Sequence, residues 1–81
     1  MRILDGLGVV NLPPSIRTRA TDHFAKLILA ENPHALLLVK VQAQGFVEGL
    51  ELVQALNTAT IEAMYLAIDH VASGRLKELL M

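Results

Sequence analysis

The chain has 81 residues, of which 53% are hydrophobic, and a formal net charge of −1 at pH 7. This length allows a single domain, 1–81, and the small net charge excludes a strong attraction of the whole molecule to nucleic acid or anionic lipid. The absence of cysteine excludes a disulfide framework, a thiolate nucleophile and a cysteine-based zinc site.

The hydrophobic content is higher than one small core can bury. Soluble domains contain roughly 45–50% apolar residues even with glycine counted, and a domain of this length buries only roughly 60–65% of its unfolded surface. A transmembrane helix needs about 18 to 20 consecutive apolar residues, and the richest stretch, 27–47, is interrupted by Asn32, Pro33 and Lys40. We therefore expect no membrane span but a cytoplasmic protein that hides the excess by self-association, as a homodimer.

Residues 1–14 are predicted to form an apolar N-terminal arm. Turn-forming Gly6 and Gly8 separate two short apolar pieces, 3–4 and 9–10, which could pair as an N-terminal hairpin. The arm carries too many apolar side chains for a free tail, so we expect it to pack on its own domain or on a partner chain.

The rest of the chain, 15–81, is predicted to be a helical body that begins with a helix over 15–31. Apolar residues recur there at intervals of three and four, forming one stripe: Ile16, Ala20, Phe24, Leu27 and Ile28. The helix should end before Pro33, because a residue that precedes proline avoids helical geometry. The same site can open the next helix, with Asn32 as N-cap and Pro33 at the first helical position.

Two patterns compete over the next segment. Residues 39–44 alternate as a half-buried strand would, which gives an α+β alternative with a short strand near 36–43. A helical register explains more residues, because apolar positions three and four apart continue without a gap: Leu36, Val39, Ala43, Phe46, Leu50 and Val53. We therefore predict a helix, with a break or kink near Gly45, since an interior glycine costs about 1 kcal/mol relative to alanine.

A third helix is predicted over 58–72, with a C-terminal stop at Ser73 and Gly74. Residues 75–81 should form one more short amphipathic turn. The predicted fold is therefore all-α, a small bundle of three to four helices, intertwined or packed as a homodimer.

Asn57 has two possible roles. The apolar register can be extended through it into a coiled-coil seam over 36–71, in which a buried asparagine fixes the register of the paired helices. Alternatively, Asn57 is the N-cap of the third helix. We expect seven residues to be buried, either within the fold or between chains, without a basis for dividing them: Leu36, Val39, Phe46, Leu50, Val53, Met64 and Ile68.

The sequence contains no recognisable catalytic, metal-binding or cofactor-binding motif. Ser15 and Ser73 lie at predicted helix ends and outside any G-x-S-x-G elbow. No two of the three histidines, His23, His34 and His70, have the spacing that would place two metal ligands on one helix face. We therefore expect a chain that is not an enzyme and takes no cofactor or metal.

The leading functional hypothesis is a non-enzymatic protein–protein interaction module of the adaptor, inhibitor or chaperone type. It would act as a homo-oligomer and bind an unidentified protein partner through exposed apolar surface. The alternative is a small dimeric DNA-binding regulator that contacts phosphates through Arg17, Arg19 and Lys26. Nucleic acid is the less favoured partner, because Asp22 lies within that cluster and the chain has one tyrosine, two phenylalanines and no tryptophan for base stacking.

Overall fold

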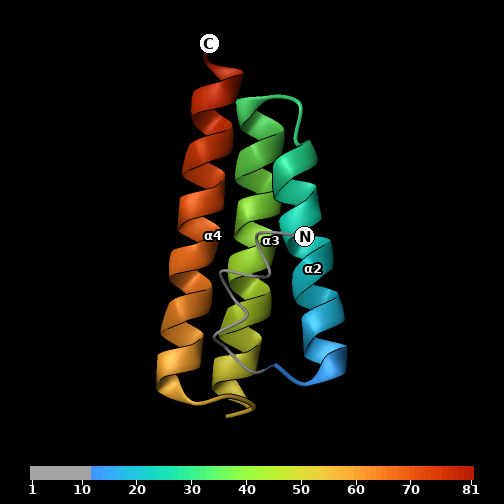
Figure 1. Ribbon diagram of the computed structural model, residues 1–81, viewed down its shortest axis with the longest axis vertical. Coiled ribbons are helices and arrows are strands. Elements are labelled where there is room, and N and C mark those ends of the chain that lie inside the picture. The colour runs from blue at the N-terminus through green and yellow to red at the C-terminus, as the bar shows by residue number, and fades with distance from the viewer. Residues whose placement is uncertain (1–11) are drawn as a thin grey trace.

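The computed structural model describes residues 12–81, and the predicted N-terminal hairpin lies outside the described residues. Within 12–81 the chain forms three helices and no strand (Figure 1): α2 (Pro14–Leu29), α3 (Pro33–Leu52) and α4 (Thr58–Leu79). The all-α prediction is confirmed. The α+β alternative with a strand near 36–43 is wrong, because that segment lies inside α3, where the helical register buries Leu36, Ala43 and Val47.

The three helices lie side by side, and each contacts the other two (Figure 1). Short connections reverse the chain after α2 and after α3, so neighbouring helices in the sequence are antiparallel neighbours in space. This arrangement buries one face of each helix and turns the opposite face of each away from the other two helices.

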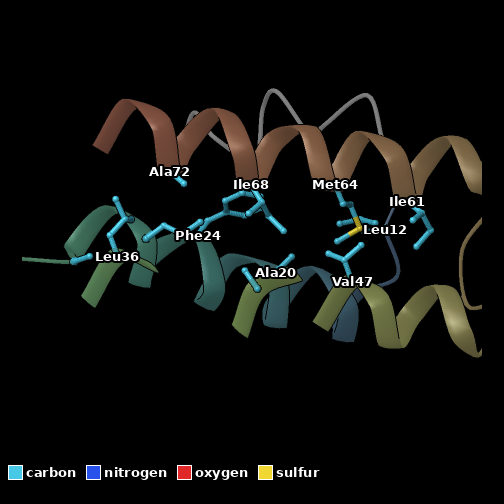
Figure 2. Close-up of a cluster of buried hydrophobic side chains, with 12 residues drawn as sticks. Leu12, Ala20, Phe24, Leu36, Val47, Ile61, Met64, Ile68 and Ala72 are labelled. Carbon is cyan, nitrogen blue, oxygen red and sulfur yellow. The ribbon is translucent and has the colours of Figure 1, made fainter. Parts of the chain in front are cut away.

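The core is built from apolar side chains contributed by all three helices, which point into a common interior (Figure 2). Phe24, Leu27, Met64 and Val47 are its largest fully buried side chains. The other buried residues are Leu12, Ala20, Ala30, Leu36, Ala43, Ile61, Ile68 and Ala72. Alanines on all three helices allow the backbones to come close, and the large side chains fill the remaining space.

Side-chain caps begin two of the helices, as predicted. The Oδ1 atom of Asn32 accepts a hydrogen bond from the Ala35 N–H at 2.8 Å, and Pro33 occupies the first position of α3. Asn57 does the same at the start of α4, where its Oδ1 accepts from the Thr60 N–H at 2.8 Å. Asn57 is therefore a helix cap that follows a turn, and the continuous coiled-coil seam over 36–71 is wrong.

Gln54 closes the C-terminus of α3 in a left-handed conformation, with φ of 53°. Its N–H donates to the Glu51 carbonyl at 3.0 Å, and the Ala55 N–H donates to the Leu50 carbonyl at 2.9 Å. This pair of bonds is a Schellman motif, in which glycine usually takes the left-handed position because a Cβ atom is strained there.

Replacing Gln54 with glycine is expected to raise the free energy of unfolding by roughly 0.5–1 kcal/mol, because it removes the left-handed strain. Urea denaturation followed by circular dichroism measures the change. The matched control is Gln42→Gly in the middle of α3, which should lower the free energy of unfolding by about 1 kcal/mol. A loss of stability in both variants would show that the turn does not strain Gln54.

The predicted helix stop at Ser73 and Gly74 is wrong, because α4 continues to Leu79. No described glycine has a positive φ, so Gly74 keeps helical geometry. Packing beyond it extends the helix: the Nε of Arg75 donates to the Ala30 carbonyl at 3.0 Å, and Leu79 packs against the core. Likewise α3 runs without the predicted break at Gly45, because its buried residues lie on both sides of that glycine.

Candidate interaction surface

Most of the seven residues predicted to be buried within the fold or between chains belong to the core of the single chain. Leu36, Met64 and Ile68 are buried, and three further residues are partly buried against the core: Val39, Phe46 and Leu50. Val53, at the C-cap of α3, is 71% exposed. The apolar surface that is free to contact another chain therefore lies largely elsewhere.

One such surface is the outer face of the N-terminal half of α3. Leu37, Leu38 and Val41 are 58%, 53% and 57% exposed. Residues three and four apart lie next to each other on a helix, so these three side chains are neighbours. The three consecutive leucines at 36–38 indicate an exposed apolar face, because a helix cannot turn all three toward one core.

A shallow groove of about 130 Å³ lies beside this face, between the first half of α3 and the last part of α4. Its walls come from both helices: Pro33, Leu36, Leu37, Lys40, Ala72, Ser73 and Leu76. The Lys40 Nζ lies 3.1 Å from the Asp69 Oδ1, so an ion pair joins the two helices next to the groove. The groove extends the apolar surface around Leu37, and the Lys40–Asp69 ion pair forms a charged border beside it.

The outer face of α3 continues past Val41 with small and charged residues. Gly45 and Gly49 are exposed, and a Cβ atom added at either would meet nothing within 4 Å among the described residues. His34 and Glu48 are exposed on the same face, seven residues before and seven after Val41. The α3 surface (residues 34, 37, 38, 41, 45, 48 and 49) thus combines bulky apolar, small and charged positions.

The other exposed apolar side chains are spread over the ends and edges of the bundle. Single exposed apolar residues are normal on protein surfaces. They comprise Ile28, Leu29, Leu52, Val53, Leu66, Leu76, Leu80 and Met81. The three adjacent α3 residues stand out because they are contiguous and lie beside a groove.

The basic residues of the DNA-binding alternative lie on α2 and are all exposed. Arg19 and Lys26, seven residues apart, lie on the same side of the helix, whereas Arg17, two residues before Arg19, is turned to the opposite side. α2 therefore places two of the three cations together.

His23 is a partly buried histidine that joins α2 to α3. Its ring centroid lies 4.9 Å from that of Phe46, with 31° between the ring planes. Its Nδ1 is buried and has no hydrogen-bond partner among the described residues. Desolvation lowers the pKa of His23 below 6.5, and the nearby Lys26 lowers it further. The folded state therefore favours the neutral imidazole.

We expect the free energy of unfolding to fall as the pH drops below 6.5. In the window between the lowered pKa of folded His23 and 6.5, the unfolded chain binds more protons, so acid favours unfolding. Urea titrations at a series of pH values, comparing wild type with His23→Gln, measure this contribution. The variant should lose part of the pH dependence, whereas His70→Gln, altered at an exposed position of α4, should keep it. Equal pH profiles for wild type and His23→Gln would contradict the assignment.

In the part of the chain that the structure describes, no group of three or more His, Cys, Asp or Glu residues is arranged to hold a metal ion. None of the helices α2, α3 and α4 has the length and apolar composition needed to cross a bilayer. No family model, curated protein or solved structure matches the chain. Its class is therefore given by its own architecture, an all-α three-helix bundle with an exposed apolar surface on α3.

Proposed function

We propose that the chain is a non-enzymatic protein–protein interaction module that acts as a homo-oligomer, of the adaptor, inhibitor or chaperone type. The observation that carries this proposal is the contiguous exposure of Leu37, Leu38 and Val41 beside the apolar groove. Contiguous apolar patches bordered by polar residues are typical of interaction sites.

The free energy gained by burying Leu37, Leu38 and Val41 is of the same order as the free-energy cost of association. Full burial of one Leu or Val side chain is worth about 1.5–3 kcal/mol, and each of these three is already about half covered. Two copies that bury all three would therefore gain roughly 5–9 kcal/mol, which is comparable with the cost of bringing two molecules together. Any net stability of the dimer must therefore come from further contacts in the groove and at the charged border of the surface.

The first test is the molar mass in solution. Size-exclusion chromatography with light scattering at micromolar concentration should give a mass above the 8.8 kDa of one chain. A monodisperse species of 8.8 kDa throughout the micromolar range would overturn the proposed self-association.

The second test asks whether the α3 surface is responsible. Leu38→Glu should shift the assembly toward the monomer, because it places a charge in the contact, while the helical circular dichroism remains. Leu66→Glu is the matched control, since Leu66 is 70% exposed and lies on α4. If Leu66→Glu dissociates the assembly and Leu38→Glu does not, the surface lies on α4 instead.

A further inference from the structure

We infer that the occupant of the α3 surface is a second copy of this chain, with its α3 packed antiparallel on the first about a two-fold axis at Val41. This inference rests on the proposed function and specifies its contact. In such a pair, each residue faces the one that lies equally far from Val41 on the other side, and each contact occurs twice.

Hydrogen-bond complementarity supports the antiparallel register. His34, seven residues before Val41, faces Glu48 of the second copy, seven residues after it. An imidazole N–H can donate to a carboxylate, and the two-fold axis makes this contact twice. Both residues are exposed in the single chain, so pairing requires no rearrangement of the fold.

The helix dipole of α3 favours the same arrangement. α3 has no acidic residue in its first turn and no basic residue in its last turn, so its own sequence leaves both ends of the dipole uncompensated. An antiparallel copy brings the Glu48 carboxylate near the positive N-terminal end of the first copy's α3.

Shape complementarity is the third argument. Leu37, four residues before Val41, faces Gly45 of the second copy, four residues after it. An interior glycine costs a helix about 1 kcal/mol relative to alanine, and no described atom approaches the place where its Cβ would lie. The part of the chain that the structure describes gives no reason for this glycine, whereas a leucine from a second copy fills the space above it.

A parallel pair in register lacks these matches. It would set His34 against His34, Glu48 against Glu48 and Gly45 against Gly45. Facing glutamates repel each other, whereas the antiparallel register sets each Glu48 against an imidazole. The side chains at the ends of the surface therefore favour the antiparallel register over a parallel one.

Disulfide trapping tests the register, because the natural chain has no cysteine to interfere. Val41→Cys places the two thiols next to each other at the two-fold axis, so mild oxidation should yield a covalent dimer on a non-reducing gel. Leu52→Cys is the matched control: it is 83% exposed on the same helix, but its two copies would lie about 33 Å apart in the antiparallel pair. It should cross-link at no more than the rate of random collision.

The outcomes separate the inference from the function on which it rests. Efficient cross-linking of both variants would indicate a parallel pair and overturn the inference, while self-association would stand. Cross-linking of neither variant, in a protein that light scattering shows to be oligomeric, would place the contact on another face. A monomer by light scattering would overturn the proposed function itself.

A charge exchange provides an independent test. His34→Glu alone should weaken the dimer by about tenfold in Kd, because it places two carboxylates together twice, and Glu48→Arg alone should weaken it because it removes the acceptor of the His34 N–H. The double variant places opposite charges together and should return the Kd toward that of wild type, as measured by sedimentation equilibrium. A double variant that is weaker than either single one would contradict the pairing of these positions.

Discussion

Replacing Phe24 with alanine is expected to lower the free energy of unfolding by about 3–5 kcal/mol. The ring is 2% exposed and is the largest of the fully buried side chains. It projects from α2 into the common interior, so its removal leaves a cavity that neighbours from three helices cannot fill without moving (Figure 2). A chain of 81 residues has a total stability of roughly 4–12 kcal/mol, so this loss is a large share of the whole.

Phe46→Ala is the matched control for this experiment. Phe46 is partly buried, and its ring contacts the ring of His23. Its removal should cost clearly less than that of Phe24, because part of the ring is already exposed to solvent. Guanidinium denaturation followed by circular dichroism measures both. Equal losses would show that the contact between α2 and α3 at Phe46 is as tightly enclosed as the centre of the core.

The helix boundaries predicted from sequence are accurate where they depend on local chemistry. Asn32 and Asn57 each accept a hydrogen bond from the N–H three residues later, an interaction that any chain with this sequence can make. The predicted stop at Gly74 failed because the competing interaction is not local. The Arg75 side chain reaches Ala30, 45 residues away in the sequence, and no local pattern contains that contact.

The candidate surface was harder to predict than the helix that carries it. The register through Leu36 correctly predicts the inner face of α3 but makes no prediction for the adjacent Leu37 and Leu38. Their exposure depends on where α2 and α4 lie around α3, which the helical period alone does not specify. The seven residues chosen as buried therefore describe mainly the intrachain core, and the open face of α3 appears only in three dimensions.

Placing aspartate at Val47 is expected to leave the chain largely unfolded. Val47 is 0% exposed, so the change removes a buried apolar side chain and introduces a carboxylate with no described partner. An uncompensated buried charge costs about 3–5 kcal/mol, and the lost apolar burial adds about 1.5–3 kcal/mol. Circular dichroism in buffer should show most of the helical signal lost, and a cooperative transition near that of wild type would contradict the position of Val47 in the core.

Replacing Val41 with aspartate should leave the fold intact and disrupt self-association, whereas the same change at Val47 should unfold the chain. Val41 lies on the same helix but is 57% exposed, so its aspartate can be solvated in the single chain and the helical signal should remain. At a two-fold axis, however, the two carboxylates would face each other, and the variant should be monomeric by light scattering. Mixing Val41→Asp with Val41→Lys should then restore association, because only the mixed pair places opposite charges at the axis. If the mixture also stays monomeric, the axis does not pass through Val41, whereas an unfolded Val41→Asp would show that this face belongs to the fold.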